Sequence, residues 1–358
     1  MKRNKVSGWA FLALGLAVLA PTIGRAVETR SIQVVAKDPA GASETVPLYR
    51  RLVAVIIGID TYQNLPAARH LSYAVGDAKG VEKTLREHFR FDQIVSLYNQ
   101  DATRENILRV LLDELRKTSE DDGVFVYFAG HGITRSMTVK GTKGDVGFLV
   151  PYDGSFDEMS KNISMQQLKS DVGPTIPAKH VFFVVDACFG GILVASRAGD
   201  AEYRKDAAYL REITGEQARQ VLTAGGQDET VLDGGPKGHS VFTGRLIEAL
   251  EEVDDYVTAR ELGVRLQKQV YGDAAARGQS QKPLFGEIYG TGDFVFVPDV
   301  EKRKSRAEAE VRGLEAEPAD LQRRQETAKR MGDEAAQRKI EAERVLQDAA
   351  LKQARLRE

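Results

Sequence analysis

The chain has 358 residues, of which 42% are hydrophobic and 28% are charged. This length supports one large core of about 250 residues together with appendages at its ends. The formal net charge of −2 leaves no basic excess to follow a phosphate backbone, and no basic stretch is interleaved with aromatic residues. The composition therefore argues against nucleic acid as the principal partner.

The first 26 residues have the pattern of a secretory signal peptide. Three basic residues within the first five precede an apolar stretch at residues 9–20, and a small-x-small motif follows at residues 24–26. We expect cleavage after Ala26, export to the periplasm or the medium, and no stable membrane span in the mature chain. An uncleaved anchor is the alternative, although about 12 apolar residues are short of the roughly 20 that span a bilayer.

The segment at residues 27–50 is polar and mixed, and we expect it to be an arm that leads into the folded domain. A short strand is expected within it at residues 32–35. The domain itself is expected at residues 51–298. It opens with the apolar run at residues 51–59, which has the character of a central strand buried on both faces.

The next element is predicted to be an amphipathic helix. Ala78, Val81, Leu85 and Phe89 recur at helical spacing. Asp77 lies at the start of this helix, where a negative charge suits the helix dipole. A short strand near residues 94–98 and a second amphipathic helix at residues 103–117 are expected to follow.

Two later apolar runs end in residues that can do chemistry. The run at residues 124–128 leads to His131, and the run at residues 181–187 leads to Cys188, the only cysteine of the chain. Ligands bind outside the carboxyl ends of parallel strands, so these side chains have the placement of a nucleophile and its base. Taken singly, each has an ordinary explanation as a buried thiol or a structural histidine. Their shared context, an apolar strand before and glycine beside each, favours catalysis.

The remaining pattern alternates strands and helices, which predicts parallel βαβ units. The polar, glycine-rich residues 132–146 predict a loop over the site. The charged, weakly periodic residues 196–219 predict an exposed linker that is accessible to proteolytic cleavage. A strand is expected to resume at residues 220–224, and a last strand at residues 293–297.

Residues 299–358 form a compositionally distinct tail, rich in Ala, Glu, Arg, Lys and Gln. Leu314 and Leu321 are one heptad apart, but Pro318 and Gly332 interrupt any sustained coiled-coil seam. We expect a charged tail that is partly helical or disordered. The alternative is a helix that binds a partner protein.

Five motifs in a fixed order carry a family resemblance. YFAGHG at residues 127–132 and DACFGG at residues 186–191 resemble the histidine and cysteine signatures of the caspase-like cysteine peptidases (peptidase family C14), and most of all the bacterial metacaspase-like, or orthocaspase, branch. AVIIGID at residues 54–60, the helix start at Asp77 and GHSVFT at residues 238–243 follow the same order. The resemblance implies an α/β fold: a three-layer α/β/α sandwich with a mostly parallel central sheet, here with a charged helical C-terminal tail.

Amide hydrolysis needs a thiolate, a donor pair for the oxyanion and an acid for the departing amine. Cys188 would supply the thiolate and His131 the acid, after which His131 would activate the water that clears the thioester. The backbone N–H groups of Gly132 and Cys188 would form the oxyanion hole. The resemblance assigns the same roles, and in this family a backbone carbonyl orients the histidine ring.

Substrate preference follows from a departure from true caspases, which present Gln where this chain has Asp186. The resemblance to metacaspases implies that Asp186 and Asp77 line a pocket for a basic side chain. We therefore expect cleavage after Arg or Lys and none after Asp. The ordinary interpretations are a helix-start charge for Asp77 and a strand-end acceptor for Asp186.

No metal or other cofactor is expected. His70, His88, His180 and His239 lack the spacing of a zinc site, and His239 has the character of a residue that holds local structure. Calcium activates several metacaspases, and Asp145 and Asp153 are the only weak candidate ligands, so calcium dependence stays open.

Two functions remain open at this stage. The first is an exported cysteine endopeptidase acting on proteins or peptides with Arg or Lys before the cleaved bond. The second is a non-catalytic protein of the same fold that recruits envelope partners through its C-terminal tail. The presence of both His131 and Cys188 favours the enzyme.

Overall fold

The computed structural model describes residues 31–38, 40–139, 142–187, 206–226, 229, 231–316, 318–331 and 333–357. Three of the expectations above fall outside these residues. They concern the signal peptide at residues 1–26, Cys188, and residues 196–205 of the expected linker.

A six-stranded sheet in the order β12-β10-β9-β5-β3-β4 forms the centre of the domain. Its parallel members are β3 (Arg51–Gly58), β4 (Gln93–Tyr98), β5 (Asp122–Ala129), β9 (His180–Asp186) and β10 (Ala218–Thr223). At one edge β12 (Leu284–Gly290) pairs antiparallel with β10. In the register of the sheet Ala129 lies opposite both Gly58 and Asp186, so the segments that follow β3, β5 and β9 emerge side by side.

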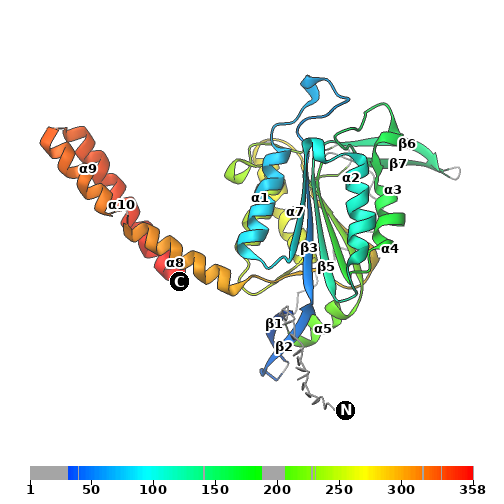
Figure 1. The fold of residues 1–358 in the computed structure, drawn as a ribbon, viewed down its shortest axis with the longest axis horizontal. Helices are drawn as coiled ribbons and strands as arrows, with labels where there is room; N and C mark the ends of the chain where they lie inside the picture. Colours follow the sequence, from blue (N-terminus) through cyan, green and yellow to red (C-terminus); the bar gives the residue numbers. More distant parts are fainter. Residues whose placement is uncertain are drawn as a thin grey trace, which may run out of the picture. The chain divides into compact units, whose positions relative to one another are not determined.

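The central strands read as unbroken apolar runs because the sheet has a core on each face. In β3 successive side chains alternate between the two cores: Leu52, Ala54 and Ile56 enter one, and Val53, Val55 and Ile57 the other. Helices α1 (Ala74–His88), α5 (Ala207–Gly215), α6 (Val241–Glu251) and α7 (Ala259–Ala276) cover the first core. Helices α2 (Arg104–Arg109), α3 (Met165–Gln167) and α4 (Gly173–Thr175) lie on the other face (Figure 1). The expected three-layer α/β/α sandwich is thus confirmed.

Local sequence explains where the helices lie. In α1, Ala78, Val81 and Leu85 are fully buried at helical spacing. A side chain at Gly58 would fall 2.6 Å from the Ala78 Cβ, so glycine lets α1 lie directly on β3. Helix α2 is shorter than its pattern predicts, because the chain continues as a π turn at Val110–Glu114 and a 3₁₀ turn at Leu115–Lys117.

An aromatic cluster joins the middle of the sheet to the last strand of the domain. β13 (Val295–Phe296) pairs with β11 (Val257–Thr258) beside the main sheet. The rings of Phe294 and Phe296 lie 4.9 Å apart, Phe296 lies 5.4 Å from Phe125, and Phe294 lies 6.0 Å from Phe182. The domain core therefore includes the end of the expected domain as well as its centre.

The N-terminal arm forms a hairpin of β1 (Ile32–Lys37) and β2 (Ser43–Tyr49). Alternate residues of β1 are buried in the core that α1 and α5 share. Tyr49 ties the hairpin to both ends of the domain: its hydroxyl lies 2.7 Å from the His180 Nδ1 and accepts the Val295 N–H at 2.9 Å.

The expectation of a loop at residues 132–146 is wrong. β6 (Gly132–Val139) and β7 (Thr142–Leu149) form an antiparallel hairpin, which β8 (Ile163–Ser164) extends to three strands. Most of the described β6 side chains are exposed or half-buried, so the sequence here carries no apolar alternation. Backbone hydrogen bonds hold such a strand, and composition does not reveal them.

The expected linker is also shorter than predicted. Its second half forms α5 and the start of β10. Asp206 caps α5 by accepting the Tyr209 N–H at 2.7 Å, and Ala207 and Leu210 are fully buried. Arg219 is itself buried, and its guanidinium donates to the backbone carbonyls of Gly173 and Ile176. Charged residues on the outer face of α5 hide this pattern in the sequence, and the antiparallel β12 was likewise not predicted.

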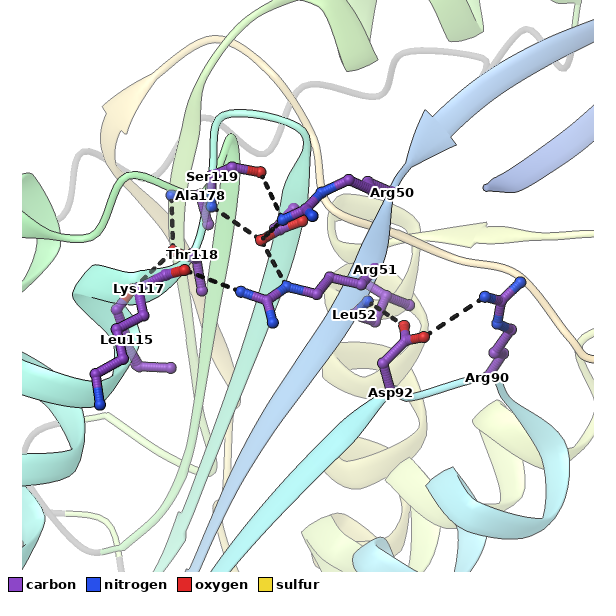
Figure 2. A network of polar contacts seen from close by, with 11 residues as sticks. Arg50, Arg51, Leu52, Arg90, Asp92, Leu115, Lys117, Thr118, Ser119 and Ala178 are labelled. Atoms are coloured by element: carbon purple, nitrogen blue, oxygen red, sulfur yellow. Dashed lines mark hydrogen bonds and ion pairs between the residues drawn. The ribbon is translucent and has the colours of Figure 1, made fainter. Parts of the chain in front are cut away.

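A network of polar contacts links the amino ends of the parallel strands, at the end of the sheet away from His131 (Figure 2). Asp122, at the start of β5, is fully buried, and its Oδ2 accepts the Arg51 Nε–H at 2.8 Å and the Ser119 N–H at 2.9 Å. Asp92 accepts the Leu52 N–H at 3.0 Å in the same region. These contacts tie the amino ends of the strands together.

The C-terminal tail is helical throughout the residues that the structure describes. It forms α8 (Val300–Ala316), α9 (Pro318–Met331) and α10 (Glu334–Arg357). Helix α10 packs against both α8 and α9, with Leu321, Ala328 and Ile340 in a small core of their own. Within the described ranges, none of the helices combines the length and apolar character needed to cross a membrane.

Candidate active site

His131 lies just beyond the carboxyl end of β5, and backbone and aromatic groups hold its ring. Its Nε2–H donates to the Arg69 carbonyl oxygen at 2.6 Å. The ring stacks on Tyr62 with centroids 4.9 Å apart and meets the edge of Phe156 at 5.2 Å. Because a carbonyl only accepts, this bond places a proton on Nε2 and leaves the Nδ1 lone pair free in the neutral ring.

Burial lowers the pKa of His131, and the nearby Arg69 and His70 charges act in the same direction. The bond to the Arg69 carbonyl opposes this shift without cancelling it. The imidazole is therefore neutral at neutral pH, which is the form that can accept a thiol proton.

Tyr62 fixes the backbone at His131. Its hydroxyl accepts the His131 N–H at 2.7 Å and donates to the Ile59 carbonyl at 3.1 Å. A side chain at Gly130 would fall 2.9 Å from this hydroxyl, so glycine is required for the close approach. The segment after β5 is thereby tied to the segment after β3.

The Gly132 N–H is free of the sheet ladder. Gly132 lies opposite Leu149, and the Val150 N–H donates to the His131 carbonyl at 3.0 Å beside this pair. In an antiparallel ladder such a bond flanks a pair whose own N–H and C=O groups point away from the partner strand. The Gly132 N–H thus points outward, as an oxyanion donor must.

Cys188 lies outside the described residues, which on this strand end at Ala187. Asp186, two residues before Cys188, is the last residue of β9 and lies opposite Ala129. Its carbonyl accepts the Gly130 N–H at 3.2 Å. The strand ends that lead to His131 and to Cys188 are therefore adjacent.

Asp77 and Asp186 belong to one buried acidic cluster, called the acidic pocket below, although they are 109 positions apart in the sequence. Ser240, which caps α6, bridges them: its N–H donates to the Asp77 Oδ1 at 3.1 Å and its hydroxyl to the Asp186 Oδ2 at 2.6 Å. His239 Nδ1 lies 2.8 Å from the same Asp77 oxygen. Asp77 is 2% exposed and Asp186 is 5% exposed.

One oxygen of this pocket is left without a donor. The Asp186 Oδ2 also accepts the Thr243 hydroxyl at 2.5 Å, and Thr243 in turn bonds the Tyr127 hydroxyl at 2.5 Å. The Asp186 Oδ1 is buried and has no hydrogen-bond partner among the described residues. Burial, together with the nearby Asp77 charge, raises the pKa of Asp186 from its ordinary 3.8 to about 7.

The family model of the caspase domain, peptidase family C14, matches residues 51–288. The chain belongs to the caspase domain family. Its match covers the whole sheet of the caspase domain from β3 to β12 apart from the last residues of β12, and it leaves out the β1–β2 hairpin and the C-terminal helices.

Among solved structures, the chain is similar to a protein from Geobacter sulfurreducens. The identity is 15%, the TM-score is 0.44, and the match covers 70% of this chain and 96% of the other. No curated protein matches the chain in sequence.

Sequence reasoning missed two kinds of residue in this caspase domain. Tyr62 and the Arg69 carbonyl hold His131, yet they come from a loop that no chemical motif marks. Asp233 lies on the exposed loop before α6, near enough for the Asp77 charge, together with partial burial, to raise the pKa of Asp233. The Val241 N–H donates at 2.7 Å to the carbonyl of Leu232, the residue before Asp233, which holds this loop against the start of α6.

The two calcium candidates do not lie together in a recognisable site. Asp145 accepts the Ser136 hydroxyl within the β6–β7 hairpin, and Asp153 accepts the Arg104 N–H at the start of α2. In the described ranges no three His, Cys, Asp or Glu side chains gather in a way that could hold a metal ion.

Proposed function

We propose that this caspase domain is a cysteine endopeptidase that cleaves peptide bonds after Arg or Lys. The observation that carries the proposal is the buried Asp186 Oδ1 beside Asp77, which has no hydrogen-bond partner within the described part of the chain. Two carboxylates in one desolvated pocket repel each other until a cation lies between them. A guanidinium or ammonium group supplies both the charge and the missing donor, whereas an aspartate side chain would add a third negative charge.

The chemical step uses groups at the neighbouring strand ends. His131 Nδ1 takes the Cys188 thiol proton, and the sulfur attacks the carbonyl carbon of the scissile bond. The Gly132 and Cys188 N–H groups donate to the oxyanion that forms. The imidazolium then protonates the departing amine, leaving a thioester, and the neutral ring activates the water that hydrolyses it.

The test compares peptides that differ only in the residue before the scissile bond. Arg, citrulline and Asp form a matched series, because citrulline keeps the shape of Arg without its charge. We expect rapid turnover after Arg, at least about thirty-fold slower turnover after citrulline and none after Asp. Equal turnover after Arg and citrulline would show that the carboxylates do not select the substrate.

A thiol-reactive peptide probe separates the enzyme from a non-catalytic binding protein. A probe that carries Arg should label Cys188 in the wild-type chain, and the label should be lost in His131→Ala. A Cys188 thiol that stays unreactive in the folded chain would favour the alternative in which the C-terminal helices recruit envelope partners.

Two further proposals concern the export and the processing of the chain. We propose export, on the basis of residues 1–26, and self-processing within residues 196–205, where Arg197, Arg204 and Lys205 match the expected specificity. Mass spectrometry of purified protein should find cuts after these residues in the wild-type chain and none in Cys188→Ala. The same cuts in both proteins would point to a contaminating protease.

A further inference from the structure

Helices α1 and α6 present the acidic pocket at their amino ends. Asp77 lies in the first turn of α1. Ser240 is the N-cap of α6, and Thr243 lies in its first turn. The pocket geometry therefore depends on how these two helices lie relative to each other.

The opposite ends of the same two helices are bound by one element, the start of α8. Lys302 Nζ donates to the carbonyl oxygens of Arg86 at 2.9 Å and Phe89 at 2.8 Å, at the carboxyl end of α1. Arg303 donates to the carbonyl oxygens of Val253 at 3.2 Å and Asp254 at 2.8 Å, just beyond α6.

Two additional contacts fix α8 in this position. The Asp299 N–H donates at 2.8 Å to the carbonyl of His88, the last residue of α1. Arg306 bonds the His88 Nε2, and burial together with this guanidinium lowers the pKa of His88, so its neutral ring accepts the bond. Carbonyls at a helix end lack partners within the helix, and cations suit the negative end of its dipole.

Close packing leaves little room for α1 and α6 to move independently. A side chain at Gly80 of α1 would fall 2.5 Å from the His239 ring and 2.9 Å from the Ile247 side chain of α6. His239 is the residue that bonds Asp77. A displacement of the carboxyl ends of α1 and α6 would therefore move their amino ends as well. Along α1 the distance from Phe89 to Asp77 is about 18 Å, at a rise of about 1.5 Å per residue.

We propose that Lys302 and Arg303 are positioning residues for the acidic pocket. We call them the α8 clamp. By joining the carboxyl ends of α1 and α6, the clamp holds their amino ends at the separation that lets Ser240 bridge Asp77 and Asp186. The C-terminal tail, which lies outside the matched residues 51–288, then helps to set the geometry of the acidic pocket.

The test uses the full-length chain with Lys302→Met and Arg303→Met combined. Lys304→Met is the matched control, because Lys304 is exposed on the same turn of α8. Hydrogen–deuterium exchange at residues 74–80 and 239–244 reports on the pocket without requiring catalysis. We expect exchange there to accelerate about five-fold in the double variant and to stay unchanged in the control. The single variant Lys302→Arg keeps a donor and a charge, so its exchange at these residues should stay as slow as in the wild-type chain.

The consequence for substrates rests on the proposed function. For an Arg peptide, the double variant should raise KM about five-fold with little change in kcat, whereas loss of folded protein alone would lower the active fraction and leave KM unchanged. Faster exchange confined to the carboxyl ends of α1 and α6, with the pocket segments unchanged, would overturn the proposal. If the double variant does not fold, Lys302→Met alone gives the same comparison. A wild-type chain that fails to cleave Arg peptides would refute the proposed function, while the exchange experiment would still decide the clamp.

Discussion

His131 and the acidic pocket lie at neighbouring strand ends, and burial disfavours the charged form in both. For His131 the result is a lowered pKa and a neutral ring, the form that the proposed base needs before substrate arrives. For Asp186 the result is a pKa raised to about 7, so its charge depends on the arrival of a cation. In the proposed peptidase, the same desolvation would therefore make one region ready in advance and the other dependent on the substrate.

Removal of the proposed base, His131, should have the largest effect on activity. His131→Ala should lower kcat/KM by about a thousand-fold or more, because the same imidazole accepts the thiol proton and protonates the departing amine. Cys188→Ala should be equally inactive, and the double variant little worse, because the two groups act as a unit. Peptide turnover with active-site titration measures this. Full activity in either single variant would refute the mechanism.

Removing the charge of the pocket should be the next largest effect. Asp186→Asn keeps the shape of the side chain but not its charge, and we expect kcat/KM for an Arg peptide to fall about thirty-fold. The citrulline peptide should be nearly unaffected. Asp121→Asn, exposed at the opposite end of the sheet, serves as control. An Asp186→Asn enzyme that still prefers Arg as strongly would show that the pocket is misassigned.

A smaller effect should separate the two regions. Tyr62→Phe deprives the His131 N–H of its acceptor, and a buried donor without a partner costs about 1–3 kcal/mol. We expect kcat to fall about ten-fold with KM for Arg peptides unchanged, because the acidic pocket does not involve Tyr62. Tyr271→Phe, on the exposed side of α7, should change neither constant. A rise in KM without loss of kcat would contradict the assignment of Tyr62 to the His131 region.

The pH dependence should show the mildest difference and the clearest sign. As pH rises from 6 to 8 through the Asp186 pKa of about 7, the pocket gains charge, so KM for Arg peptides should fall by roughly five-fold. Alkylation of Cys188 by uncharged iodoacetamide should instead depend on a group that titrates below 6.5, as the lowered His131 pKa requires. A single pKa governing both reactions would mean that the two regions titrate as one.

The same pKa shift predicts a change in stability. Between about pH 4 and 7 the folded chain keeps the Asp186 proton that the unfolded chain, with a pKa near 3.8, releases. The free energy of unfolding should therefore decline as pH rises through this range. Asp186→Asn should lack this decline, which thermal unfolding at pH 5 and pH 8 would reveal as a relative gain in Tm at the higher pH.

The sequence predicted the fold where burial on both faces leaves a continuous apolar signal. The strands at β3, β5 and β9, and the helix at α1, follow from such patterns. The β6–β7 hairpin did not, because its side chains are largely solvated. Helix α5 did not either, because charges on its outer face obscure the buried Ala207 and Leu210.

The candidate site divides in the same way. Side chains with distinctive chemistry, such as His131, Asp77 and Asp186, could be named from motifs. The groups that hold them could not, because a carbonyl such as that of Arg69 has no sequence signature, and Tyr62 reaches His131 across 69 positions. His239 was expected to hold local structure, and it holds Asp77.

The aromatic cluster of Phe125, Phe182, Phe294 and Phe296 has a consequence for the order of folding. Half of its rings come from the centre of the sheet and half from residues 294–296, more than a hundred positions later. Contacts of such large sequence separation form late, because long loops must close first. A growing polypeptide that has emerged only as far as β10 lacks Ser240, Thr243 and two of the four rings. The acidic pocket thus stays unassembled until residues 240–243 have been synthesised.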